Sequence, residues 1–177
     1  MKGLTRFLGR ILPFWREEKA TGTIEFVVLV PLLVSLMCSS VETGVMMTRF
    51  VVLERALDQV VRTIRLGQAY TQDEFRTAVC TTAGILPACE ESLVVEMQVI
   101  NTSTWVLPST NAPCYDREEE VRPATTFNTG DQNQMVLIRT CIIYDAFMPT
   151  IGIGETLANR GQGQFYIKAA SAYVQEP

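Results

Sequence analysis

Residues 26–48 read FVVLVPLLVSLMCSSVETGVMMT and form an apolar run that a single charged side chain, that of Glu42, interrupts. At about 1.5 Å of rise per residue, a helix of this length reaches about 34 Å, which is enough to cross a hydrocarbon core about 30 Å thick. Hydrocarbon offers the backbone no hydrogen-bond partners, so a segment that spans it must be helical. The run therefore predicts a transmembrane helix.

A cleaved signal peptide and a buried core helix are the alternatives. A signal peptide has an apolar region of about 7–15 residues followed by a small-residue cleavage site, whereas this run is longer and no A-x-A site follows it. A core helix would not explain the basic segment before the run. Residues 1–20 have a net charge of +3, which leaves −7 for the rest of a chain whose total is −4. By the positive-inside tendency, residues 1–20 form a basic cytoplasmic tail or leader and the rest lies outside the cytoplasm.

The helix is expected to continue beyond the membrane, over about 24–66. After residue 48 the sequence becomes amphipathic, with an apolar stripe at spacings of three and four residues and charged or polar residues on the other face. Gly67 is a plausible C-terminal stop. The predicted division is a tail at 1–20, a long helix at 21–67 that spans the membrane over about 26–48, and an outer domain at 68–177. The stripe consists of Phe50, Leu53, Leu57, Val60, Val61 and Ile64.

The outer domain is expected to contain a second helix and about three strands. Thr71 and Glu74 have the spacing of a capping box at the start of a helix over 71–82. Three segments rich in β-forming residues, 93–100, 135–144 and 164–174, predict strands. Residues 101–133 are expected to be a polar loop, and residues 148–163, with four glycines, a second connection. The fold class is then α+β, with a long helix leaning on a small antiparallel sheet.

Four of the five cysteines lie in this outer domain: Cys80, Cys89, Cys114 and Cys141. An even number in a non-cytoplasmic domain is typical of disulfides, and four cysteines allow three pairings. We favour Cys80–Cys89 and Cys114–Cys141, because the first closes a short loop and the second would tie a long loop to a strand. Zinc is the rival interpretation, but the chain has no C-x-x-C pair and no histidine.

Composition argues against several functions. The acidic bulk of the chain does not suit nucleic acid, since phosphate neutralisation needs clustered Lys and Arg. The absence of histidine removes the usual general base and the commonest metal ligand. A Ser–Lys arrangement could use only Lys168 in the outer domain, and no flanking motif supports it. We expect no catalytic, cofactor-binding or metal-ligating residues and no small-molecule substrate. An acidic cluster, more typical of a solvated face than of a calcium site, comprises Asp116, Glu118, Glu119 and Glu120.

Two acidic residues in the apolar helix need a reason, because a carboxylate there is costly. Glu25 lies in the sequence KATGTIEF at 19–26, directly before the apolar run. It could lie among the headgroups and cap the helix, or it could act in assembly, paired with a charge on a neighbouring chain. Glu42 could reach water at the outer boundary or be buried against a partner helix. A small-residue face that suits close helix packing consists of Cys38, Ser39, Ser40 and Gly44.

These features together resemble the TadE/TadF-like minor pilins, or pseudopilins, of tight-adherence (Flp) pilus systems. The matching features are the basic tail, the sequence TIEF that places Glu25 before Phe26, the apolar run with Pro31, and the second acid at Glu42 before TG at 43–44. The sequence LERALD at 53–58 and the ending AASA at 169–172 leading to EP at 176–177 also fit. The N-terminal match covers about residues 16–66, and the outer domain matches in size and strand order.

The resemblance implies a non-enzymatic subunit that acts by helix–helix packing in the bacterial inner membrane and through a periplasmic domain. Its implied partners are membrane lipid, a prepilin peptidase, the major Flp pilin, other minor pilins and inner-membrane pilus-assembly proteins. The family's cut usually follows a glycine five residues before the glutamate. Here a cut after Ala20 would make Thr21 the first residue and Glu25 the fifth, whereas a cut after Gly22 would start the chain at Thr23. An uncut anchor, such as a periplasmic receptor or an envelope enzyme, is the alternative.

Overall fold

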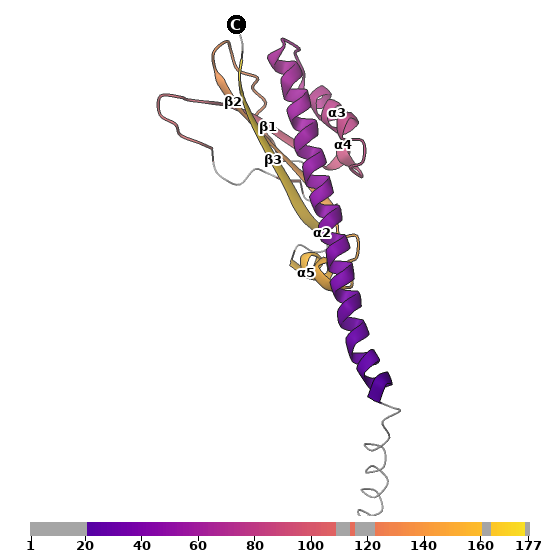
Figure 1. Ribbon diagram of the computed structural model, residues 1–177. Coiled ribbons are helices and arrows are strands. Elements are labelled where there is room, and N and C mark those ends of the chain that lie inside the picture. Colours follow the sequence, from indigo (N-terminus) through magenta and orange to yellow (C-terminus); the bar gives the residue numbers. More distant parts are fainter. Residues whose placement is uncertain (1–20, 109–113, 116–122, 161–163, 176–177) are drawn as a thin grey trace, which may run out of the picture.

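A single long helix, α2 (Thr21–Arg65), carries all the other elements on its later part (Figure 1). The computed structural model describes residues 21–108, 114–115, 123–160 and 164–175. In these residues the helices are combined with a three-stranded antiparallel sheet, so the fold is α+β, as the sequence predicts. The predicted limits of the long helix, 24 and 66, lie within three residues of those observed.

The first third of α2 projects away from the rest of the molecule (Figure 1). Only 6% of the most apolar window of this helix is buried, and among the described residues α2 is the one helix long and apolar enough to cross a membrane. A core helix of a soluble domain would be mostly covered by its own chain, and this one is not. The large apolar side chains that are exposed here are Ile24, Phe26, Val27, Val28, Leu29, Leu32, Leu33, Val34, Leu36 and Met37.

The later half of α2 forms one wall of the hydrophobic core. The predicted stripe is buried from Leu53 to Ile64, and Phe50 is partly buried at its edge. Each such leucine or valine contributes about 1.5–3 kcal/mol when it leaves water. The helix ends as predicted at Gly67, whose φ of 93° only glycine adopts easily. The N–H of Gly67 donates to the Ile64 carbonyl at 2.9 Å.

The sheet has the order β1-β2-β3, with β2 in the centre. Its strands are β1 (Val94–Ile100), β2 (Met135–Asp145) and β3 (Gln164–Val174), within one residue of the predicted segments. The alternation of side chains gives the sheet an inner face that packs on α2, as Ile142 opposite Ile167 illustrates. The buried apolar residues of this face are Val95, Met97, Val136, Ile138, Ile142, Tyr144, Phe165, Ile167, Ala169 and Tyr173.

Helix α3 (Gln72–Ala83) completes the core beside α2 (Figure 1). The predicted capping box is present: the Thr71 hydroxyl accepts from the Glu74 N–H, and the Glu74 carboxylate accepts from the Thr71 N–H at 2.8 Å. This backbone hydrogen bond lowers the pKa of Glu74 below its usual value. The short helix α4 (Cys89–Ser92), which the sequence did not predict, follows.

The structure contains both favoured disulfides. Cys80 at the end of α3 pairs with Cys89 at the start of α4, with a Cα–Cα distance of 5.6 Å. Cys114 pairs with Cys141, which faces outward from the central strand β2, with a Cα–Cα distance of 5.3 Å. The second bridge therefore ties the long segment between β1 and β2 to the outer face of the sheet.

The connection predicted at 148–163 contains a helix, α5 (Gly152–Arg160), which the sequence did not predict. Two of its four glycines, Gly152 and Gly154, lie in the first turn of α5. Some predictions concern residues that the structure does not describe: the tail at 1–20, the acidic cluster at 116–120, and residues 176–177.

Candidate functional site

The residues of the predicted processing site open helix α2. Thr21, Gly22 and Thr23 are its first three residues, and Ala20 lies outside the described residues. Glu25 follows on an exposed part of the helix, and so does the neighbouring Phe26, which is 67% exposed. The described chain thus leaves the Glu25 carboxylate on the bare apolar part of α2, available to groups outside this chain.

Glu42 has a different environment from either of those considered in the sequence analysis. Its side chain is 1% exposed, so it does not reach water, and its own chain rather than a partner helix covers it. One carboxylate oxygen accepts from the N–H of Phe147 at 2.9 Å and the other from the N–H of Met148 at 2.8 Å. These two donors lie just after β2. Glu42 therefore binds the β2–α5 connection to the apolar part of α2.

The contact between α2 and α5 is close enough to require glycine. A Cβ added at Gly152 would overlap the Ser39 hydroxyl oxygen, and one added at Gly154 would overlap the carbonyl oxygen of Met148. The Ser39 hydroxyl accepts from the N–H of Ile153 at 3.2 Å and donates to the carbonyl of Ser35 at 2.8 Å. The small side chain of Ser39 and the absence of one at Gly152 thus bring the backbones of α2 and α5 together, and Gly154 lets α5 approach Met148 in the preceding connection. We call residues 146–154 the foot segment.

A cationic and aromatic pair lies above the foot segment. The Arg49 guanidinium lies over the ring of Tyr144, 4.9 Å from its centroid, and Arg49 is the first charged residue of α2 after Glu42. Burial raises the pKa of Tyr144 to about 12, and the nearby Arg49 charge opposes this rise. Tyr144 is buried in the core, whereas an arginine at the end of an apolar stretch is typical of the membrane–water interface, where its guanidinium reaches the headgroup region.

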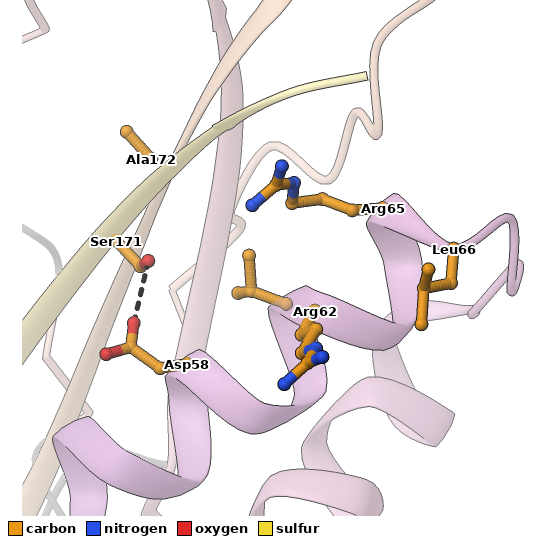
Figure 2. Close-up of a pocket in the computed structure, with 7 residues that line it drawn as sticks. Asp58, Arg62, Arg65, Leu66, Ser171 and Ala172 are labelled. Carbon is orange, nitrogen blue, oxygen red and sulfur yellow. Dashed lines mark hydrogen bonds between the residues drawn. The ribbon is translucent and has the colours of Figure 1, made fainter. Parts of the chain in front are cut away.

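A cavity of about 540 Å³ lies at the opposite end of the molecule, between the end of α2 and β3 (Figure 2). The Ser171 hydroxyl donates to the Asp58 carboxylate at 2.9 Å across this groove, and the side chain of Arg65 extends toward β3 (Figure 2). The groove thus contains a carboxylate already bound by a hydroxyl. The other lining residues are Val61, Arg62, Leu66 and Ala172.

A Ser–Lys pair does not form at this groove. Ser171 is on the inner face of β3, with Ala169 and Tyr173, whereas Lys168 is on the outer face by the alternation of the strand. The two side chains therefore point to opposite sides of the sheet. Among the described residues, no group of three or more Cys, Asp or Glu side chains is placed to hold a metal ion.

The foot segment is the feature that sequence reasoning missed. One signal was present: residues 146–154 read AFMPTIGIG, with no charged residue, between Asp145 and Glu155. This apolar stretch in an otherwise acidic domain indicates a surface that water does not cover. Its contact with Glu42, more than 100 residues away, could not be read from a local pattern.

Comparison of the chain with models of known protein families, with curated proteins and with solved structures finds no match. The function is therefore argued from the residues and their arrangement.

Proposed function

We propose that this chain is a non-enzymatic minor pilin, or pseudopilin-like assembly subunit, of a tight-adherence (Flp) type pilus. In this proposal the first part of α2 anchors the chain in the bacterial inner membrane and packs against the helices of other subunits. The outer domain lies in the periplasm. The observation that carries the proposal is the bare apolar part of α2, with the exposed Glu25 at its head.

The continuity of α2 supports a permanent anchor. The apolar part and the core-forming part are one uninterrupted helix, and the later part supplies buried residues such as Leu53 and Leu57. Removal of the apolar part at its outer end would cut through this helix. A signal peptide, by contrast, is separated from the folded domain by its cleavage site.

Two features support the proposed orientation. Both disulfides lie in the outer domain, and disulfides persist in oxidising compartments such as the periplasm. The segment before α2 is basic, and basic segments remain in the cytoplasm. Each feature independently favours a cytoplasmic N-terminus and a periplasmic outer domain.

Glu25 is the residue proposed to set the position of the helix among its neighbours. A carboxylate that faces lipid is unfavourable, and pairing with a cationic group of a neighbouring chain removes that cost. The terminal amine of a processed subunit is such a group. Glu42 is not available for this role, because two backbone N–H groups of its own chain already bind it.

The test is co-purification of the full chain from membranes with the major pilin and other pilus-assembly proteins. We expect Glu25→Ala to leave the chain in the membrane fraction and to reduce the recovery of these partners at least severalfold. Glu54→Ala is the matched control, because Glu54 is an exposed glutamate of the same helix beyond the predicted membrane span. Equal recovery of pilus proteins with all three forms would overturn the role of Glu25. Recovery of none of them with the unaltered chain would overturn the proposed function.

A further inference from the structure

We propose that the foot segment, residues 146–154, inserts into the outer leaflet of the bilayer that α2 crosses, so that the chain has a second contact with lipid. The inference rests on the proposed membrane anchoring by α2 and goes beyond it, because a single-pass anchor needs no other lipid contact. The occupant proposed for the exposed apolar surface of the foot segment is lipid.

The length of bare helix is the first argument. Thirteen residues separate Gly22 from Ser35, where the contact with Gly152 begins, and they amount to about 20 Å of helix. A hydrocarbon core is about 30 Å thick. The charged sequence REEK at 16–19 does not suit hydrocarbon on the other side. The bare part of α2 is therefore too short, and the span must include the part that the foot segment covers.

The position of Arg49 places the foot segment at the same depth when the distance is counted from the outer surface of the membrane. Arg49 is the first charged residue after Glu42, and a guanidinium at the end of an apolar stretch suits the headgroup level. Arg49 lies seven positions after Glu42, which is about 10 Å along the helix. The N–H groups that Glu42 binds thus lie about 10 Å below Arg49, within the outer leaflet.

Three backbone N–H groups of the foot segment have acceptors on α2 that suit such a depth. Non-helical backbone is tolerated in hydrocarbon only where protein groups satisfy its N–H and C=O groups. Glu42 satisfies the N–H groups of Phe147 and Met148, and Ser39 satisfies that of Ile153. A buried acid in a membrane helix thereby has a physical role, since it binds polar backbone that water cannot reach.

The side chains of the foot segment present an apolar surface outward. Phe147, Ile151 and Ile153 are 59%, 42% and 44% exposed. On α2, Leu36 and Met37 lie between Ser35 and Ser39, which contact Gly152, and they are exposed as well. Water would be an unfavourable environment for this combined surface, whereas acyl chains match it.

The experiment measures the depth of a fluorophore in vesicles that contain the full chain. Single cysteines are introduced at Ile151, Leu33 or Leu66 in a chain with Cys38→Ala, and each is labelled with an environment-sensitive dye. Leu33 is in the bare part of α2, and Leu66 is 77% exposed at its far end. Lipids with a nitroxide on the acyl chain and iodide in the water are the two quenchers.

We expect the label at 151 to lose intensity to the nitroxide lipid to a degree comparable with the label at 33, and to resist iodide. The label at 66 should show the reverse. Quenching at 33 but not at 151 would overturn the insertion of the foot segment and leave the anchor intact. Protection of the label at 151 from both quenchers would also overturn it, because another protein would then cover the segment. Absence of lipid quenching at 33 would instead overturn the membrane anchoring itself.

Discussion

A carboxylate oxygen of Glu42 accepts a hydrogen bond from the backbone N–H of Phe147, a residue 105 positions further along the chain. This contact, with the parallel one to Met148, joins the apolar helix to the outer domain at a level where the sequence predicts membrane. It makes the apolar helix and the outer domain one structural unit. The position of the domain relative to the apolar part of α2 is then fixed by direct contact rather than left to a flexible linker.

Replacement of Glu42 by leucine should release the foot segment. Two buried N–H groups would lose their acceptor, and each unsatisfied group costs about 1–3 kcal/mol. We expect faster hydrogen exchange at the amides of Phe147 and Met148 in the full chain in detergent micelles, with β2 less affected. Glu54→Leu is the matched control on the exposed face of the same helix. Unchanged exchange at both amides in the Glu42→Leu chain would show that the carboxylate does not hold this segment.

Replacement of a glycine of the foot segment by alanine should destabilise the protein. In Gly154→Ala the new Cβ would overlap the Met148 carbonyl oxygen, and such overpacking costs about 1–3 kcal/mol. The matched variant is Gly44→Ala on α2, where no atom lies within 4 Å of the new Cβ; there the stability should be unchanged or raised by up to about 1 kcal/mol. Thermal unfolding of the full chain in micelles measures the difference. Equal midpoints for the two variants would contradict the close approach.

The two disulfides should stabilise the outer domain unequally. The Cys114–Cys141 bridge spans 27 residues and the Cys80–Cys89 bridge spans nine. By loop entropy alone, their removal costs about 3.5 and about 2.5 kcal/mol, respectively. Paired Cys→Ser variants of the full chain, unfolded in urea and followed by near-ultraviolet circular dichroism, give this difference. Peptide mapping without reduction checks the pairing, and a fragment that links Cys80 to Cys141 would contradict it.

The stability of the outer domain should fall at high pH because of Tyr144. Burial raises its pKa from 10.0 to about 12, so the folded protein holds this proton more tightly than the unfolded chain does. The stabilisation that results is fully present below pH 10 and is lost as the pH rises to about 12. Burial also raises the pKa of Tyr173, so part of the dependence should remain in Tyr144→Phe.

At neutral pH the Tyr144→Phe variant should be as stable as the unaltered chain or more stable. The Tyr144 hydroxyl is buried and, within the part of the chain that the structure describes, has no hydrogen-bond partner, so its removal relieves a desolvation cost. Urea midpoints at pH 7 and across pH 10–12 test both statements. If the stability of Tyr144→Phe fell between pH 10 and 12 as much as that of the unaltered chain, groups other than Tyr144 would be responsible for the loss.

The sequence predicts the parts of this fold that local patterns encode. The spacing of Leu53, Leu57 and Val61 marks the buried side of α2, and Thr71 with Glu74 marks the start of α3. Alternation along β3 indicates which residues face the core. In each case the signal lies within a few residues of the structure that it specifies.

The site is less accessible to such reasoning, because its contacts are long-range. Gly152 and Gly154 look like a loop in sequence, but a side chain at Gly152 would meet Ser39 of α2 and one at Gly154 would meet the carbonyl of Met148. The surroundings of Glu42 depend on backbone N–H groups, which every residue except proline carries and which no side-chain pattern marks. Sequence reasoning identified Glu42 as an unusual residue, and only the structure shows what it binds.

The most direct test of the account is the intact mass of the membrane-bound chain, measured in cells with and without an active prepilin peptidase. The account predicts a chain that begins at Thr21 or Thr23 when the peptidase is active and the full-length chain when it is not. A membrane-bound chain that keeps Met1 in the presence of the active peptidase would contradict the assignment to the processed pilin subunits.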